Sequence, residues 1–204
     1  INQLYKSGVT VHLNTKVEPE QIKESEADSI ILALGAYPVM FPIKGQEKNK
    51  VYTAIEAYKH LEEIGNQVVI IGGGSIGCEL GVDLAKLGKE VTVLELGAVL
   101  NRTLNDIMKT ALEVEMEKYN TLTAFTETNC KEIKENFVIT QMKDGSLKEI
   151  PADTVIFAAG MRSRIDEADT FYGIVQDTNI IGDANRVGTV WSALEDGYYI
   201  SANL

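Results

Sequence analysis

Apolar residues along this chain alternate between short continuous runs and longer segments with helical spacing. The short runs are VTVHL (9–13), SIILALGAY (29–37) and DTVIFAAG (153–160). Runs of this length, and above all the two that reach a glycine at or near their end, are typical of buried parallel strands. Helical spacing covers residues 53–65 and 190–204. Because strands and helices succeed one another in this way, the pattern predicts an α/β fold.

The segment 67–96 contains the most complete succession of elements. A VVII strand is followed by a glycine turn, a helix with an apolar stripe, a glycine stop at Gly88 and a second strand, VTVLEL. The stripe consists of Ile76, Leu80, Leu84 and Leu87. A strand–helix–strand unit of this length predicts a Rossmann-like parallel sheet.

Two further segments complete the predicted elements. Residues 103–119 have helical spacing, with a Thr103–Asp106 capping box at the start. The apolar residues expected to face inward are Leu104, Ile107, Met108, Ala111 and Leu112. Residues 121–152, from the run LTAFTE onward, change to a period of two around Asp144-Gly145. This alternation predicts an antiparallel β-meander. Residues 178–184 are expected to form a strand and a turn.

The turn after the VVII strand has the spacing G-x-G-x-x-G, formed by Gly72, Gly74 and Gly77. Gly72 allows the tight turn, Gly74 lets the backbone approach a pyrophosphate, and Gly77 lets the helix pack on the strand. Free N–H groups at the helix start, around Ser75 and Ile76, favour a phosphate. The motif therefore predicts a dinucleotide site, and a glycine-rich turn without a ligand is the alternative.

Glu95 ends the second strand of this unit, 18 residues after Gly77. A ribose-binding acid is expected about 20 residues after the glycine motif. Such a carboxylate accepts hydrogen bonds from ribose hydroxyls and repels a 2′-phosphate. The nearest basic residue that follows is Arg102. We therefore predict NADH rather than NADPH, with a solvated strand end as the alternative for Glu95.

The composition excludes several classes of protein. The 204 residues include 19 basic and 30 acidic side chains, a net charge of −11, which argues against nucleic-acid binding. No apolar run approaches the ~18–20 residues that span a bilayer, so no membrane partner is predicted. With two cysteines, we expect a reducing compartment and a cytoplasmic location. The chain begins at Ile1, without an initiator Met, and we expect a piece of a longer protein.

Three further motifs stand in a recognisable order: ADSIILALGAYP (27–38), ADTVIFAAGMRS (152–163) and NIIGDA (179–184). Together with the glycine motif, they resemble the two-dinucleotide flavoproteins, which include the pyridine nucleotide–disulfide oxidoreductases. Within this family, the GCEL run (77–80), the GKEVTVLE run (88–95) and the final ALEDGYY are similar to the C-terminal half of 2-enoate reductases and 2,4-dienoyl-CoA reductases. In those enzymes an old-yellow-enzyme-like barrel precedes an FAD/NAD module.

This resemblance implies an NAD(H)-binding domain at residues 46–160. Residues 1–45 and 161–204 would form an incomplete FAD-binding lobe, whose N-terminal half is missing. Gly35 and Gly160 would end the strands that leave and re-enter the FAD domain. Gly182 and Asp183 would bind the flavin's ribityl chain, with a helix cap as the alternative for Asp183. The resemblance places Glu79 near the nicotinamide.

The resemblance implies an NADH-dependent flavin oxidoreductase that passes hydride to FAD. The parent would reduce an activated C=C bond of the enoate or dienoyl-CoA type, with FMN and an iron–sulfur cluster in the missing part. Homo-oligomers are common among such flavoproteins. Two alternatives stay open: an NADH oxidase or disulfide-reductase type of flavoprotein, and a non-catalytic redox-sensing NAD module. By itself, the chain is expected to be inactive.

No side chain is predicted to act as a catalytic acid, base or nucleophile. His12 and His60 stand alone, and no metal-ligand spacing is present, so no metal site is predicted. The paired redox cysteines of the disulfide reductases are absent from this sequence. Cys78 falls in the first turn of the cofactor helix, where a thiol can be reactive. A buried packing role is the simpler interpretation for Cys78 and Cys130.

Overall fold

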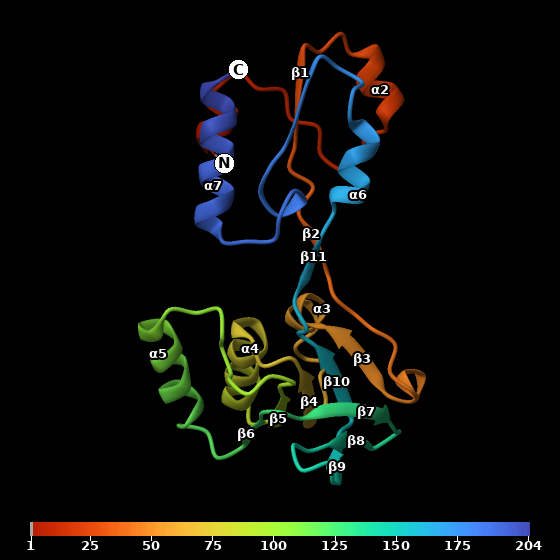
Figure 1. The fold of residues 1–204 in the computed structure, drawn as a ribbon, viewed down its shortest axis with the longest axis vertical. Helices are drawn as coiled ribbons and strands as arrows, with labels where there is room; N and C mark the ends of the chain where they lie inside the picture. Colours follow the sequence, from red (N-terminus) through yellow and green to blue (C-terminus); the bar gives the residue numbers. More distant parts are fainter. Residues whose placement is uncertain (1) are drawn as a thin grey trace. The chain divides into compact units, whose positions relative to one another are not determined.

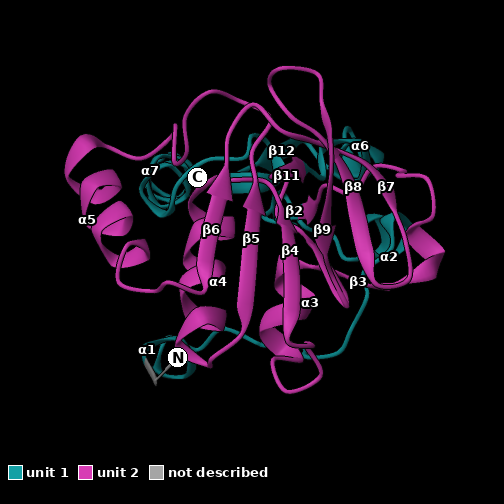
Figure 2. Ribbon diagram, turned by 90° about the horizontal axis from the view of Figure 1, so that it is seen from below, with its two compact units in different colours: residues 1–36, 163–204 teal, residues 37–162 magenta. Residues whose placement is uncertain are grey.

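The computed structural model describes residues 2–204, in which a five-stranded parallel sheet is the largest element. The residues divide into two units, one of residues 37–162 and the other of residues up to 36 with 163–204 (Figure 2). The chain passes between the units within β2 (Ala36–Pro38) and β11 (Met161–Ser163), which pair with each other (Figure 1). The expected NAD domain, residues 46–160, lies within the larger unit.

The parallel sheet of the larger unit has the strand order β3-β10-β4-β5-β6. Its strands are β3 (Lys50–Thr53), β4 (Gln67–Ile71), β5 (Glu90–Leu94), β6 (Leu122–Phe125) and β10 (Thr154–Phe157). β4 pairs with both β10 and β5, so the glycine turn that follows it lies in the middle of one edge of the sheet. That edge holds the carboxyl ends of all five strands, where ligands bind in folds of this kind.

Both faces of this sheet are covered, which explains the continuous apolar runs of its strands. Successive residues of β4 point to opposite faces: Val68 and Ile70 join one core, and Val69 and Ile71 join the other. The first core includes residues of α3 (Ala54–Lys59), α4 (Ser75–Lys86) and α5 (Asp106–Met116). The second includes residues of the antiparallel sheet β7-β8-β9.

The antiparallel sheet is formed by β7 (Asn129–Ile133), β8 (Phe137–Gln141) and β9 (Leu147–Pro151). Its inward residues Ile133, Val138 and Ile150 are buried against the parallel sheet. The hairpin between β8 and β9 turns at Asp144-Gly145, where Gly145 has a φ of +82°. The predicted class, an α/β fold with a parallel sheet and an antiparallel meander, is confirmed.

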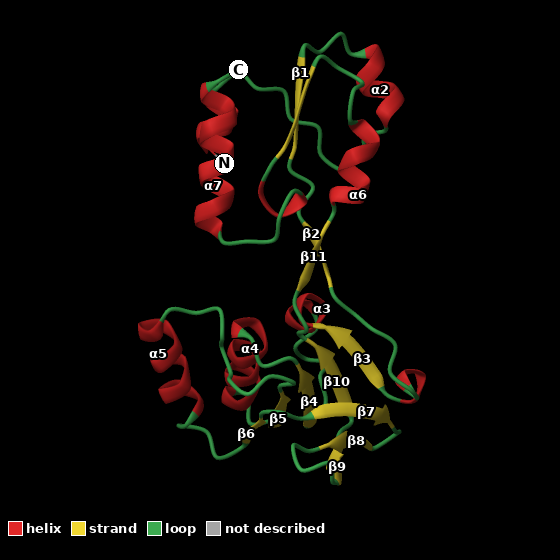
Figure 3. Ribbon diagram, viewed as in Figure 1, coloured by secondary structure: helices red, strands yellow, loops and turns green. Residues whose placement is uncertain are grey.

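The smaller unit is built on the parallel pair β1 (Ser29–Leu32) and β12 (Asp177–Ile180). Its helices are α1 (Asn2–Lys6), α2 (Pro19–Glu24), α6 (Ile165–Ala168) and α7 (Val190–Ala202), shown in red in Figure 3. Leu32, Ala168 and Phe171 form its buried core. Short 3₁₀ turns cover Gln46–Lys48 in the larger unit, and Asp169–Phe171 and Gly182–Ala184 in this one.

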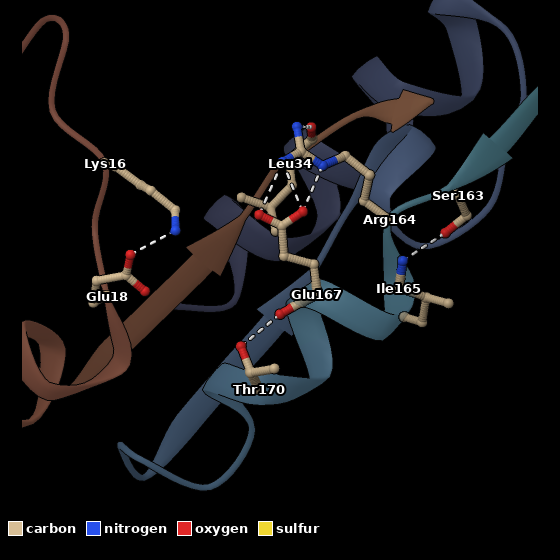
Figure 4. Close-up of polar contacts among 8 residues, drawn as sticks. All are labelled: Lys16, Glu18, Leu34, Ser163, Arg164, Ile165, Glu167 and Thr170. Carbon is tan, nitrogen blue, oxygen red and sulfur yellow. Dashed lines mark hydrogen bonds and ion pairs between the residues drawn. The ribbon is translucent and has the colours of Figure 1, made fainter. Parts of the chain in front are cut away.

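Hydrogen bonds of the Arg164 side chain connect the start of α6 to the segment that follows β1 (Figure 4). Its guanidinium donates to both carboxylate oxygens of Glu167 at 2.8 Å, and to the Leu34 carbonyl at 3.2 Å. The Ser163 hydroxyl accepts the Ile165 N–H at 3.0 Å, and the Thr170 hydroxyl donates to the Glu167 carbonyl at 2.7 Å. Nearby, Lys16 pairs with Glu18 at 2.6 Å. These polar contacts supplement a small apolar core.

Three strand predictions need correction. Residues 9–13 form no strand, because no other described strand pairs with them, and Val9, Val11 and Leu13 are exposed. The run 29–37 is broken into β1 and β2 because Gly35 takes a φ of +77°. The LTAF run, expected in the meander, is instead β6 of the parallel sheet, paired with β5. An alternating pattern fits either sheet, and the preceding α5 provides the crossover that a parallel strand needs.

The helix predictions need three corrections. The helix expected at 53–65 ends at Lys59, and a Cβ on Gly65 would lie 1.9 Å from an Asp153 oxygen, so that side chain would have to move. The helix after residue 103 is capped by Asn105, whose side chain accepts the Met108 N–H at 2.9 Å. Ile107 is 84% exposed, and Met108 and Ala111 are also exposed, so these three residues do not face inward as the spacing predicts.

The buried part of the apolar stripe of α4 is shorter than the spacing predicts. Leu80 and Leu84, in the middle of the helix, are fully buried against the sheet. Ile76 and Leu87, at its two ends, are 41% and 60% exposed. They extend past the sheet edges, because Ile76 lies at the glycine turn and Leu87 is the C-cap before Gly88.

Candidate functional site

The glycine turn between β4 and α4 needs two of its glycines for its own geometry. Gly72 has a φ of +119°, and a Cβ there would lie 2.3 Å from the Ala158 carbonyl oxygen. A Cβ on Gly77 would lie 2.0 Å from the Gly72 carbonyl oxygen. No real side chain approaches backbone this closely. Gly72 and Gly77 therefore let β10, β4 and α4 approach one another, whatever binds nearby.

Gly74 differs from these two because a Cβ there would meet nothing within 4 Å. Its φ of −73° is open to any residue, and it is the N-cap of α4. The first helical hydrogen bond runs from Cys78 N–H to the Gly74 carbonyl at 3.0 Å. The N–H groups of Gly74, Ser75 and Ile76 find no acceptor among the described residues. Together with the dipole of a 12-residue helix, they offer an open site for a phosphate.

The carboxylate of Glu95 lies against this glycine turn. Its Oε2 accepts the Gly73 N–H at 2.7 Å, and its Oε1 accepts the Gly97 N–H at 2.6 Å. These bonds fix the side chain at the carboxyl end of β5. Because an ionised carboxylate has about four acceptor positions, Glu95 can still accept the hydroxyls of a ribose. The residues present therefore fit a dinucleotide, with pyrophosphate at the start of α4 and ribose at Glu95.

Gly73 is a further residue of the candidate site that the motif spacing does not single out. A Cβ there would lie 2.5 Å from a Leu100 methyl group and 2.7 Å from the Glu95 Cβ. Its sequence signal is the uninterrupted run of three glycines, of which the G-x-G pattern explains only the outer two. The middle glycine makes room for the acidic side chain beside the turn.

Glu79 lies on the exposed side of α4, one helical turn after Ser75. The Tyr58 hydroxyl of α3 donates to Asp83 on the same helix at 3.4 Å. Burial, together with the negative charges of Asp83 and Glu79, raises the pKa of Tyr58 to about 12. The phenol therefore stays protonated at neutral pH. Glu79 is exposed on the helix that begins at the glycine turn.

The site residues expected around the flavin divide between the units. Gly160, in the larger unit, has a φ of +98° and accepts the Val39 N–H at 2.9 Å. Gly35, Gly182 and Asp183 belong to the smaller unit. Asp183 Oδ1 accepts the Gly188 N–H at 3.0 Å, so this carboxylate also organises the loop before α7.

Asp196 is a further residue at the Gly182–Asp183 turn that the sequence patterns do not indicate. Its Oδ2, from the second turn of α7, accepts the Gly182 N–H at 2.9 Å. Gly182 has a φ of +58°, and a Cβ there would lie 3.4 Å from the Ala193 Cβ. The turn is therefore held against α7 by both a carboxylate and a close contact.

The cysteines are placed as packing residues. Cys78 and Cys130 are free thiols, 0% and 7% exposed. Burial raises the pKa of each thiol to about 11, and the Glu95, Glu113 and Glu79 carboxylates add to the effect at Cys78. Both are protonated at neutral pH, in spite of the helix start beside Cys78. The part of the chain that the structure describes holds no cluster of three metal-ligating side chains.

Comparison with known proteins identifies the family. The family model described as "Pyridine nucleotide-disulphide oxidoreductase" matches residues 2–185. The chain belongs to this family. The family name implies NAD(P)H and FAD as cofactors, and the resemblance drawn from the four motifs is confirmed.

Individual members of the family cover nearly the whole chain. A cinnamate reductase of Clostridium sporogenes is 31% identical over 97% of this chain and 30% of its own length. An NADH oxidase of Thermoanaerobacter brockii is 29% identical over 98% of this chain and 31% of its own. The structure of a 2-naphthoyl-CoA reductase bound to 2-naphthoyl-CoA matches with a TM-score of 0.91, at 28% identity, over 100% of this chain and 31% of its own. The chain therefore spans about 30% of the length of these relatives.

Proposed function

We propose that this chain binds NADH and passes its hydride to FAD, as part of a longer flavin-dependent oxidoreductase. The observation that carries the proposal is the open site at the start of α4. Three N–H groups without acceptors, the uncrowded Gly74 and the carboxylate of Glu95 lie together at the carboxyl ends of β4 and β5. This combination suits a pyrophosphate joined to a ribose.

Each residue would have a separate task. Gly74, Ser75 and Ile76 would donate to the pyrophosphate, Glu95 would accept from the ribose, and Gly72 and Gly77 would keep the turn closed. The cofactors, when bound, supply the chemistry of hydride transfer between nicotinamide and flavin. The chain's own part is positioning and electrostatics, since hydride transfer needs no acid or base. Glu79 would lie near the nicotinamide end.

We propose NADH rather than NADPH as the donor, because a fixed anion at Glu95 would repel a 2′-phosphate. Both oxygens of that side chain accept backbone N–H groups, which hold the carboxylate in place beside the glycine turn. Arg102, the nearest basic residue that could attract a 2′-phosphate instead, is exposed. The coenzyme preference therefore depends on one carboxylate.

Gly35, Gly160, Gly182 and Asp183 would contribute to FAD binding in the parent. Asp183 fits this role because one of its oxygens accepts only the Gly188 N–H, which leaves acceptor capacity for flavin hydroxyls. The rest of the FAD site would come from the part of the parent that lies outside these residues. The isolated chain is accordingly expected to bind NADH and to retain little FAD.

The proposed parent reaction is reduction of an activated C=C bond, with FMN and an iron–sulfur cluster in the remaining part. Support comes from relatives named as reductases of cinnamate and of 2-naphthoyl-CoA. We also propose that the parent is a homo-oligomer, which light scattering would test. A cytoplasmic location is proposed because the two cysteines are free thiols. No helix among the described residues is long and apolar enough to cross a membrane.

The experiment that tests the proposal uses the longer parent protein, purified with its flavins. Under anaerobic conditions, NADH should bleach the flavin absorbance near 450 nm, and an enoate or enoyl-CoA should restore it. Failure of NADH to bleach a yellow parent, or a colourless parent, would contradict the proposal. A colourless parent that still binds NADH would favour the redox-sensing module.

An NADH oxidase is the second candidate, because a relative of equal coverage carries that name. It predicts rapid reoxidation by oxygen and none by enoates. A disulfide reductase would need a redox-active thiol pair, and the two cysteines of this chain are both buried and protonated. That chemistry would therefore require cysteines in the remaining part of the parent.

A further inference from the structure

Asn101 lies in the loop after β5 in a backbone conformation that most residues avoid. Its φ is +53°, in the left-handed region, where asparagine is several-fold more frequent than most residues. The side chain is fully buried, and its amide atoms form no geometrically defined hydrogen bond with the described residues; its one polar interaction there is with the Cys78 thiol, whose pKa it lowers against the larger effect of burial. Burial of an unpartnered amide opposes folding. Hydrogen bonding of the side chain therefore does not explain asparagine at this position, whereas its tolerance of the left-handed conformation does.

The main chain of Asn101 holds the middle glycine of the cofactor turn. Its N–H donates to the Gly73 carbonyl at 2.8 Å, and the Cys78 thiol donates to the same oxygen at 3.5 Å. The Gly73 N–H, on the other side, donates to Glu95 at 2.7 Å. Gly73 is thus fixed at both of its polar atoms, and the neighbouring Leu100 leaves no room for a side chain there.

The direction of the Gly73 carbonyl decides where the next N–H points. The peptide bonds of the described chain are all trans, and in a trans peptide the C=O and the following N–H point in opposite directions. With the Gly73 carbonyl held by the Asn101 N–H, the Gly74 N–H points the opposite way, and it has no acceptor among the described residues. Asn101 thereby prepares the first donor of the phosphate site.

We propose that Asn101 is a positioning residue for the pyrophosphate: its left-handed backbone holds the glycine turn in the conformation that binds phosphate. This inference rests on the proposed NADH binding. A residue that disfavours the left-handed conformation would let the Gly73–Gly74 peptide rotate in the free protein. Since the apparent Kd equals the intrinsic Kd divided by the competent fraction, a turn that is about one-tenth competent binds about tenfold more weakly.

The test compares four forms of the chain: wild type, Asn101→Ala, Asn101→Gly and the control Asn14→Ala. Glycine adopts the left-handed conformation freely, whereas alanine does not. Asn14 is an asparagine with a φ of +52° in the other unit, so the control repeats the substitution away from the turn. Calorimetry measures the Kd of NADH, ADP and adenosine, and circular dichroism checks folding.

We expect Asn101→Ala to raise the Kd of NADH and ADP about tenfold, or about 1.4 kcal/mol, and to leave adenosine, which lacks phosphate, within about twofold. Asn101→Gly and Asn14→Ala should bind all three like the wild type. Equal weakening of adenosine, or weakening in Asn101→Gly as large as in Asn101→Ala, would overturn the proposal. Asn101→Ser is a milder second variant with the same expected direction, should alanine prevent folding.

The two hypotheses fail in different ways. A wild-type chain that binds neither NADH nor ADP would overturn NADH binding and the role of Asn101 with it. A wild-type chain that binds NADH, together with a folded Asn101→Ala that binds it equally well, would overturn the role of Asn101 alone.

Discussion

Substitution of Glu95 by Gln tests the dinucleotide site most directly, because it changes charge with little change in shape. The carboxylate accepts the Gly73 N–H at 2.7 Å and the Gly97 N–H at 2.6 Å. Glutamine offers one carbonyl oxygen and one NH₂ group, so one of these two N–H groups loses its acceptor. Hydrogen bonds to charged groups contribute about 1.5–3 kcal/mol. Because Gly97 is exposed, we expect a loss of about 1.5 kcal/mol in the free energy of unfolding.

The effect on coenzyme binding should be opposite for NADH and NADPH. Loss of a charge-assisted bond to the ribose, about 1.5–3 kcal/mol, should raise the Kd of NADH by about 10- to 100-fold. A carboxylate and a phosphate charge about 4 Å apart repel by about 4 kcal/mol at an effective dielectric constant near 20, less at high salt. Removing this repulsion should improve NADPH binding. The ratio of the NADPH and NADH Kd values should therefore fall by at least about 100-fold.

The assay is titration of the purified chain with each coenzyme, followed by nicotinamide fluorescence at low and at physiological salt. Glu90→Gln is the matched control, since Glu90 is an exposed residue at the other end of the same strand. It should change neither Kd by more than about twofold. An unchanged NADPH-to-NADH ratio in Glu95→Gln, with the protein folded, would refute the assignment of the ribose to Glu95.

Three further outcomes follow from the structure. Gly74→Ala should leave the thermal midpoint unchanged or slightly higher, yet weaken NADH binding at least about tenfold. Gly77→Ala should instead unfold the chain at a markedly lower temperature, because the new Cβ would overlap the backbone. Cys78 and Cys130 should resist iodoacetamide at pH 8 in the native state. Their raised pKa values of about 11, against 9 when unfolded, predict stability that is fully present below pH 9 and lost as the pH rises from about 9 to 11, measurable by urea unfolding. Arg164→Ala should destabilise the smaller unit by about 1 kcal/mol, a value discounted because the Arg164–Glu167 pair is partly exposed. Amide hydrogen exchange should become faster in residues 163–204 but not in the larger unit.

The larger unit could be predicted from the sequence because its local signals agree with its tertiary packing. The VVII strand is apolar at every position, since both faces of the sheet are covered. Gly88, with a φ of +80°, ends α4 as its position in the sequence indicates. The turn, the helix and the second strand each carry a signal within a few residues, and all three signals predict the same unit.

The errors occur where a segment's partner is distant in sequence. Residues 9–13 alternate like a strand, but a strand exists only by pairing, and no described strand pairs with them. The start of α5 depends on whether Thr103 or Asn105 caps it, and both residue types are good caps. Asp196 and Asn101 act through single hydrogen bonds to glycines 14 and 28 residues away. No periodicity in a single sequence reports such contacts.

The three glycines of the motif are present for different physical reasons. This difference decides how much the motif by itself can indicate about function. Gly72 and Gly77 are required by contacts within the chain, so any tight strand–turn–helix unit would need them, whether or not it bound a nucleotide. Gly74 faces open space with an ordinary φ, and folding makes no demand for glycine there. Its small size matters only if something approaches from outside. Gly74 is therefore the glycine that argues for a ligand, because the fold does not need it. Comparing how a substitution of Gly74 changes stability and how it changes binding separates a nucleotide site from a turn of the same shape.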